Sequence, residues 1–242
     1  MRQYLETTRS PWYSYLFVLP LLVLYQTMAV VANLGRERGV INGADALLQN
    51  ALQSLGLHGW LGSWLVAAAV VGVIVFRRDA AHSAKPLRRG YFGLMLAESA
   101  AYALVFGSVV AFLTSLLLPG GLLLQMGGGR MTWEQKLAAS LGAGLYEELV
   151  FRLILTGSLI WLFGRLGWKR GTTIASAVLA SSVIFSAFHY VGAYGDPFEL
   201  GSFTFRFVAG VVLAGLFAAR GFAVAAWTHA LYDVFLVFVG KA

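Results

Sequence analysis

Long apolar stretches of this sequence contain a set of ionisable side chains: Glu98, Glu147, Glu148, Arg152, His189, Arg206, His229 and Asp233. A charge at the middle of a bilayer costs roughly 2.5 to 3.5 kcal/mol on insertion scales, so residues of this kind mark functional sites by default. Glu147, His189, His229 and Asp233 are the members of this set whose side chains could take part in catalysis. They come from three different apolar stretches, and helices would have to bring them together.

Two chemistries suit a glutamate, two histidines and an aspartate. In a metal-free hydrolysis, Glu147 assisted by His189 deprotonates a water molecule, and His229 helps to stabilise the tetrahedral oxyanion. In a metal-dependent one, Glu147, His189 and His229 hold a divalent ion such as zinc, with an open position for water. The helical H-E-x-x-H zinc motif is absent. The spacing leaves both chemistries open.

The stretch YEELVFR, residues 146–152, places two adjacent carboxylates and an arginine in one apolar segment. On an α-helix, residues four apart share a face and adjacent residues point about 100° apart. The spacing therefore predicts that Glu148 pairs with Arg152, while Glu147 faces elsewhere as a general base. The alternative is that all three charges form one packing network.

The same four-residue spacing recurs in two later segments. It places His229 and Asp233 on one face, where the aspartate can orient the imidazole and fix its tautomer. It also predicts that the ring of Phe185 packs against His189. We expect structural roles for Glu98, with a partner not assigned, and for Arg206, with Glu199 or Asp196 as partner.

The composition is that of an integral membrane protein. Of the 242 residues, 59% are hydrophobic and 12% are charged, whereas soluble domains carry about 25% charged residues. Cysteine is absent, which excludes disulfides, thiolate metal ligands and cysteine-protease chemistry. The net charge of +7 is attributed to basic residues in cytoplasmic loops. No nucleic acid is expected as a partner.

The expected fold is an all-α polytopic membrane helix bundle, forming a single integral membrane domain over residues 1–242. Residues 41–59 are predicted to form an interfacial amphipathic helix, and 117–130 a loop or re-entrant element. About seven stretches are predicted to span the membrane: 12–34, 59–76, 91–118, 136–164, 172–190, 202–219 and 222–239.

Lys and Arg residues are distributed unequally between the two sides of these spans. Eleven lie on the side of the N-terminus and five on the other, which predicts a cytoplasmic N-terminus and an external C-terminus. The C-terminus changes sides if the last two spans form one broken helix. At about 1.5 Å per residue, Glu147 lies near the middle of the membrane and His189 near its outer edge, so their meeting requires a tilt or a later helix start.

Three short patterns together resemble the signature of the CPBP intramembrane proteases. They are Glu147-Glu148-x-x-x-Arg152, Phe185-x-x-x-His189 and His229-x-x-x-Asp233, in this order on successive helices. This family contains the type II CAAX prenyl endopeptidases and bacteriocin-processing proteins. The resemblance covers roughly residues 130 to 240, the expected protease core.

The resemblance implies a membrane peptidase whose active-site cavity lies within the bilayer. By position, Glu147 and His189 would activate the water, His229 and residue 233 would stabilise the oxyanion, and Glu148 and Arg152 would support the site. Many members have Asn where this chain has Asp233. Because an ionised aspartate cannot donate a hydrogen bond, orienting His229 is its expected role.

We therefore expect an intramembrane endopeptidase that hydrolyses a peptide bond in a membrane-associated protein or peptide, located in the bacterial inner (cell) membrane. Its expected partners are membrane lipids and that substrate. A glutamate-activated water without a cofactor is favoured, and zinc is the alternative. The alternative function is a non-catalytic scaffold or a proton-coupled carrier, although a carrier often shows internal pseudo-symmetry and none is visible here.

Overall fold

The computed structural model describes residues 2–34, 42–54, 56, 60–82, 87–118, 131–192 and 195–239. Over these ranges the chain is all-helical, as expected. The elements are α1 (Arg2–Thr8), α2 (Pro11–Asn33), α3 (Gly43–Ser54), α4 (Trp60–His82), α5 (Arg89–Leu117), α6 (Trp133–Gly142), the π-helix η1 (Ala143–Thr156), α7 (Gly157–Arg165), α8 (Arg170–Phe188), α9 (Leu200–Arg220) and α10 (Phe222–Val239).

Five helices in the described part of the chain are long and apolar enough to cross a membrane: α2, α5, α8, α9 and α10. They confirm a membrane helix bundle but not the predicted count of seven spans. The predicted span 136–164 is divided into α6, η1 and α7, because its backbone changes to π-helical geometry. Residue 59 of the second predicted span and most of the loop predicted over 117–130 lie outside the described residues.

Local sequence signals explain where two of these helices begin. The hydroxyl of Ser10 accepts a hydrogen bond from the backbone N–H of Tyr13, and Pro11 occupies the first turn of α2, where proline is tolerated. Thr132 and Gln135 form a reciprocal capping box at the start of α6. Because capped helix starts satisfy backbone donors that would otherwise be buried, both helices can begin next to apolar surroundings.

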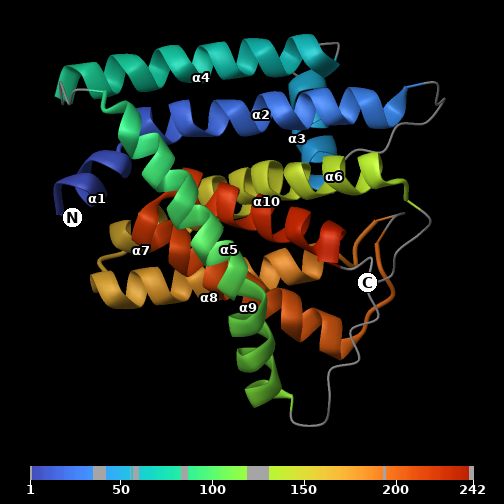
Figure 1. Ribbon diagram of the computed structural model, residues 1–242. Coiled ribbons are helices and arrows are strands. Elements are labelled where there is room, and N and C mark those ends of the chain that lie inside the picture. Colours follow the sequence, from blue (N-terminus) through green and yellow to red (C-terminus); the bar gives the residue numbers. More distant parts are fainter. Residues whose placement is uncertain are drawn as a thin grey trace.

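Helix α10 lies at the centre of the bundle, where it packs against α2, α5, α6, α9 and η1 (Figure 1). All residues from Ala223 to Ala230 are buried, and many of them are alanines. Small side chains let neighbouring helices approach closely in a membrane. The half of α10 that carries His229 is therefore enclosed by other helices.

The closest approach to α10 is made by η1, at Gly144. A Cβ atom at this position would lie 2.5 Å from the backbone nitrogen of Ala230. Because that distance is too short for any side chain, only glycine allows the two helices to meet here. This contact brings the glutamates of η1 next to His229, which directly precedes Ala230.

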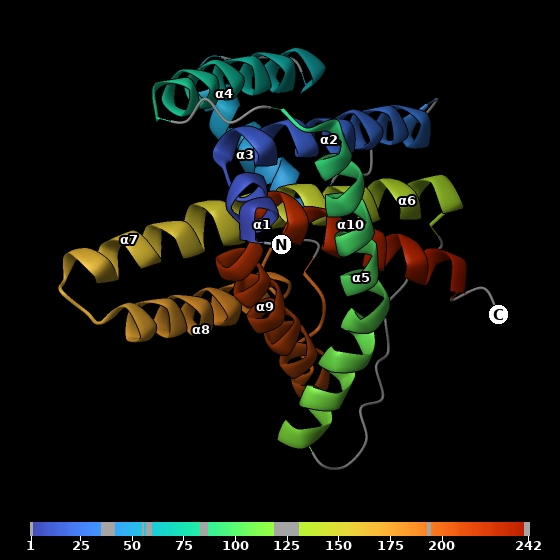
Figure 2. The same ribbon diagram turned by 60° about the vertical axis from the view of Figure 1, so that its left-hand side comes forward.

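The chain reverses between α9 and α10 at Gly221, whose φ of 91° lies in the left-handed region that glycine adopts readily. The two helices contact each other beside this turn. Helix α1 and the end of α10 lie at opposite ends of the molecule (Figures 1 and 2).

Candidate active site

Residues 146–152 lie in the π-helix η1. Their spacing predicts the pair Glu148–Arg152 on the assumption of an α-helix. At the end of η1, the backbone N–H of Gly157 bonds to the carbonyl of Arg152, five residues earlier. Hydrogen bonds of this i→i+5 type widen the turn, and π-helical segments are frequent at functional sites. The site is therefore built on an unusual stretch of backbone.

Glu148 is held on both of its carboxylate oxygens. Its Oε2 lies 3.2 Å from Nε of Arg152, and its Oε1 lies 2.8 Å from Nδ1 of His229. The side chains of Glu148 and Arg152 are 0% and 1% exposed. The ion pair predicted from the spacing is thus present, and the contact with His229 is a second role that the spacing did not indicate.

Phe185 joins the buried arginine to the second histidine. The guanidinium carbon of Arg152 lies 4.2 Å from the centre of the Phe185 ring, which is a cation–π contact. On its other side the Phe185 ring meets the imidazole of His189 edge-on, with 4.9 Å between ring centres. The predicted packing of Phe185 against His189 is confirmed.

His189 follows the last residue of α8, and its ring is oriented by the backbone. Its Nδ1 lies 2.9 Å from the carbonyl oxygen of Phe185. A carbonyl oxygen only accepts hydrogen bonds, so Nδ1 carries the proton and Nε2 of a neutral ring has a free lone pair. His189 can therefore accept a proton on the nitrogen that points away from its own helix.

Glu147 has different neighbours from Glu148. Its Oε1 accepts a hydrogen bond of 2.9 Å from the side-chain amide of Asn42, and among the described residues it forms no ion pair. It lies within electrostatic range of both His189 and His229.

Asn42 is a site residue that the sequence did not reveal. Its side-chain oxygen accepts a hydrogen bond of 2.8 Å from the N–H of Ala44 and so caps α3, while its amide holds Glu147. An asparagine before an amphipathic segment is a normal capping signal. That signal predicts the start of a helix, and nothing local to residue 42 indicates a contact with residue 147.

Asp233 lies next to the other nitrogen of His229, with 3.5 Å between Oδ2 and Nε2. It also lines a cavity of about 830 Å³ between α5, α9 and α10. The walls of this cavity are mainly apolar, and Arg206, Glu199 and Asp196 add charge. Asp233 thus connects the histidine to a space large enough for part of another chain.

Glu98 and Arg206, expected to be structural, both have charged partners. Glu98 is paired with Arg220, at 2.5 Å and 2.7 Å, and accepts a hydrogen bond from the hydroxyl of Tyr4. Burial and the neighbouring Glu98 carboxylate raise the pKa of Tyr4, which therefore remains a donor at neutral pH. Arg206 pairs with Asp196 at 2.5 Å, one of the two partners expected for it.

Glu147, His189 and His229 are the residues expected to hold an ion in the metal-dependent alternative. In the part of the chain that the structure describes, no group of three His, Asp or Glu side chains is arranged to hold an ion. His189 uses Nδ1 for a carbonyl and keeps Nε2 free, whereas His229 has a carboxylate beside each of its nitrogens. The metal-dependent chemistry therefore stays an alternative.

Residues 130–235 match the family model described as Type II CAAX prenyl endopeptidase Rce1-like. This match covers a little under half of the chain and supports a CPBP family intramembrane protease. The Rce1-like family is a family of proteases. The family match and the apolar helices together support an integral membrane protein. Comparison with curated proteins and with solved structures gives no match. The Rce1-like segment includes η1, His189, His229 and Asp233, whereas Asn42 lies outside it.

Proposed function

We propose that the chain is an intramembrane endopeptidase in which Glu147 is the general base of a water-dependent peptide hydrolysis. The observation that carries the proposal is the division between the two adjacent glutamates. Oε1 of Glu148 is hydrogen-bonded to His229, and its Oε2 forms an ion pair with Arg152. Within the described part of the chain, Glu147 has the neutral amide of Asn42 as its one hydrogen-bond partner, and it lies within electrostatic range of two imidazoles. It is the carboxylate that is free to take a proton.

In this mechanism a water molecule binds between Glu147 and His189. Glu147, assisted by Nε2 of His189, takes a proton from the water as its oxygen attacks the carbonyl carbon of the scissile peptide bond. The C–N bond of the resulting tetrahedral intermediate then breaks, and the proton passes to the leaving nitrogen. The products are a new carboxyl terminus, which contains the water oxygen, and a new amino terminus.

His229 is the group that stabilises the oxyanion of the intermediate. Glu148 fixes its Nδ1, so that Nε2 of the protonated ring is directed toward Asp233 and the cavity beside it. The two carboxylates balance the positive charge of that ring. A donor fixed before the reaction is worth more than one that must reorient. Asp233 then orients His229 rather than binding the oxyanion itself.

The substrate is a membrane-associated protein or peptide whose scissile segment enters the cavity between α5, α9 and α10. That cavity combines apolar walls with charged residues, which suits an extended segment with both kinds of side chain. We place the enzyme in the inner (cell) membrane of a bacterium with its N-terminus in the cytoplasm, because basic residues are more numerous on that side. No step of the mechanism passes through a metal ion.

The proposal is tested by incubating the purified chain with membranes that contain its natural substrates in water enriched in ¹⁸O. Hydrolysis adds one ¹⁸O atom to each new carboxyl terminus, which mass spectrometry detects. We expect such termini with the unchanged protein and none with Glu147→Gln. Labelled termini that persist with Glu147→Gln would contradict the mechanism. Their absence from both samples, together with proton-coupled flux in liposomes, would instead indicate a carrier.

A further inference from the structure

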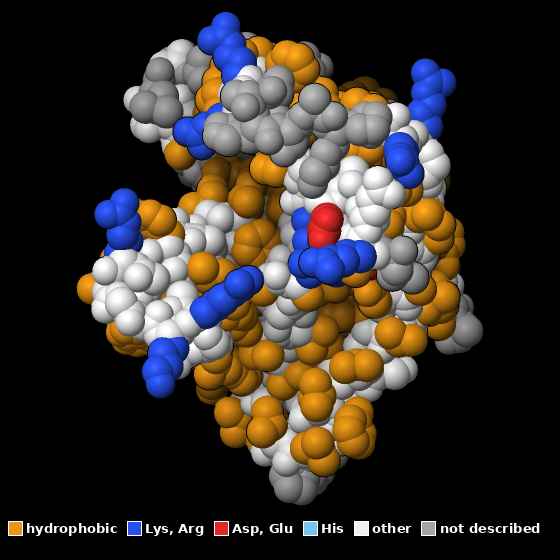
Figure 3. All heavy atoms as spheres, turned by 90° about the vertical axis from the view of Figure 1, so that its left-hand side faces the viewer, with side chains coloured by type: hydrophobic (Ala, Val, Ile, Leu, Met, Phe, Trp, Pro, Cys, Tyr) orange, Lys and Arg blue, Asp and Glu red, His pale blue; other side chains and the backbone are white. Residues whose placement is uncertain are grey.

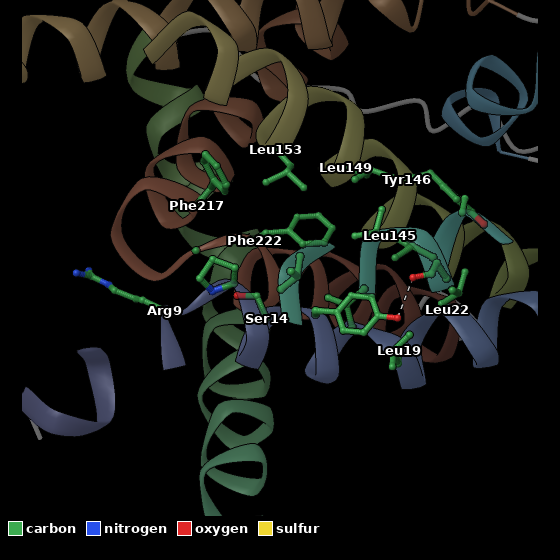
Figure 4. Close-up of a pocket in the computed structure, with 18 residues that line it drawn as sticks. Arg9, Ser14, Leu19, Leu22, Leu145, Tyr146, Leu149, Leu153, Phe217 and Phe222 are labelled. Carbon is green, nitrogen blue, oxygen red and sulfur yellow. Dashed lines mark hydrogen bonds between the residues drawn. The ribbon is translucent and has the colours of Figure 1, made fainter. Parts of the chain in front are cut away.

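A second cavity lies on the side of η1 that faces α2 and α4, and it is separate from the proposed active site. Its volume is about 400 Å³. Its walls come from α2, α4, η1 and the turn between α9 and α10, and nearly all of them are apolar. Figure 4 shows leucines of η1 and of α2 pointing toward each other across this space, which we call the α2–η1 groove.

The α2–η1 groove has an inner end and an outer end. At the inner end lie Leu145 and Tyr146, which are 4% and 1% exposed. At the outer end lie Gly221 and Arg9, whose side chain extends away from the groove (Figure 4). The groove therefore leads from one end of the bundle into its interior.

The length of the α2–η1 groove corresponds to one leaflet of a membrane. Its lining along α2 runs from Pro11 to Leu22, and the eleven steps between these twelve residues, at about 1.5 Å each, cover roughly 16 Å. The hydrocarbon core of a bilayer is about 30 Å thick, so an acyl chain of one leaflet reaches to about half of that. An acyl chain that enters at the outer end would end near Leu145.

The charges around the outer end favour an anionic headgroup. Arg9 is exposed there, and Arg77, Arg78, Arg88 and Arg89 are exposed at the neighbouring ends of α4 and α5. Figure 3 shows this end of the molecule, where Lys and Arg side chains surround an apolar hollow. Basic side chains at this level attract anionic lipids.

From this geometry we propose that the α2–η1 groove binds one acyl chain of an anionic phospholipid from the surrounding membrane, with the headgroup at Arg9. Leu145 and Leu149 of η1 contact the chain, whereas Glu148, on the same π-helix, is bound to His229. The lipid therefore packs against the outer side of the helix that carries the proposed catalytic glutamate. The binding itself does not depend on the proposed function.

The proposal is tested with full-length protein in phosphatidylcholine vesicles that contain a phosphatidylglycerol with a photoreactive group at the middle of one acyl chain. After illumination, mass spectrometry locates the labelled residues. We expect labels on residues that line the groove, such as Leu19 and Val71. Labels spread evenly over exposed residues of α2 and α5 would overturn the proposal.

Three variants separate the groove from the general lipid surface. Val71→Trp fills the groove and should abolish its labelling, as should Leu19→Trp, which acts from the opposite wall. Val23→Trp, at an exposed position of α2 outside the groove, should leave labelling unchanged. Unchanged labelling in folded Val71→Trp and Leu19→Trp proteins would contradict the site.

The headgroup is tested by comparing the same photoreactive chain on phosphatidylglycerol and on phosphatidylcholine. We expect a preference of about five-fold for phosphatidylglycerol, because one basic side chain near an anionic surface contributes an effect of that size. Arg9→Gln should remove the preference and Arg165→Gln, at the end of α7, should keep it. If an apolar peptide substrate displaces the photoreactive lipid, the groove is a binding site for the substrate, and the lipid proposal is overturned. Because labelling requires no cleavage, its failure is distinguishable from failure of the proposed protease activity.

Discussion

The side-chain amide of Asn42 donates a hydrogen bond of 2.9 Å to Oε1 of Glu147, across 105 residues of sequence. The contact connects the start of α3 to the π-helix. It also places a residue from outside the Rce1-like segment at the proposed general base. The protease core therefore receives part of its site from the N-terminal half of the chain.

Replacing Asn42 by Asp should lower the turnover number while leaving stability nearly unchanged. Aspartate keeps the oxygen that caps α3 but removes the amide donor and places a second carboxylate beside Glu147. A hydrogen bond to a charged group is worth roughly 1.5 to 3 kcal/mol, so we expect a loss of about ten- to a hundred-fold in kcat. Steady-state kinetics and thermal unfolding test this expectation.

Asn50→Asp, at an exposed position of the same helix, is the matched control and should retain full activity. Full activity of Asn42→Asp as well would show that Asn42 only caps α3.

Replacing Gly144 by Ala should separate η1 from α10. The added methyl group would overlap the backbone of Ala230, and overpacking of this kind costs about 1 to 3 kcal/mol. Because the two helices would move apart, the contact between Glu148 and His229 should weaken and activity should fall. Gly215→Ala serves as control, since a Cβ there meets nothing within 4 Å. Equal unfolding midpoints for the two variants would contradict the close approach.

The pair Glu98–Arg220 should contribute more to stability than Asp196–Arg206. The side chains of the first pair are 16% and 6% exposed, and those of the second are 44% and 26% exposed. Removing one partner of a buried pair costs about 3 to 5 kcal/mol, because the other charge remains uncompensated. An exposed pair contributes about 1 kcal/mol or less.

We therefore expect Arg220→Met to lower the free energy of unfolding strongly and Arg206→Met to lower it slightly. Denaturant unfolding in detergent micelles measures both. A double variant with Glu98→Leu and Arg220→Met should recover much of the loss. A double variant as unstable as Arg220→Met alone would show that the pair is not the cause.

Removing divalent metals should leave proteolysis intact. Among the described residues no three His, Asp or Glu side chains are arranged to hold an ion, and each nitrogen of His229 lies beside a carboxylate. Cleavage measured before and after treatment with a chelator tests this, together with elemental analysis of the active protein. Activity that disappears with the chelator and returns with zinc would contradict the metal-free mechanism.

Contacts encoded by local spacing could be predicted from the sequence. The pair Glu148–Arg152 and the packing of Phe185 on His189 each join residues four apart, and both are present. Five of the predicted spans also coincide with apolar helices, because a run of apolar residues long enough to cross the bilayer can be recognised without knowing its neighbours.

Contacts that depend on packing between distant segments could not be predicted. Asn42 and Glu147 meet because α3 packs on η1, and Glu98 meets Arg220 because α5 passes the end of α9. The π-helix was also missed, since the apolar pattern of residues 136–164 predicts a helix without distinguishing its hydrogen-bond register.

The central claim is that Glu147, and no other group, takes the proton from the attacking water. The most direct test is the cleavage rate of purified Glu147→Gln at saturating substrate, with Glu6→Gln as an exposed control and the unfolding midpoint of each protein as the measure of folding. A general base contributes about 10² to 10⁴ in rate. We therefore predict a loss of that size for Glu147→Gln and an unchanged rate for Glu6→Gln. A folded Glu147→Gln protein that cleaves within a few-fold of the unchanged rate would contradict the mechanism.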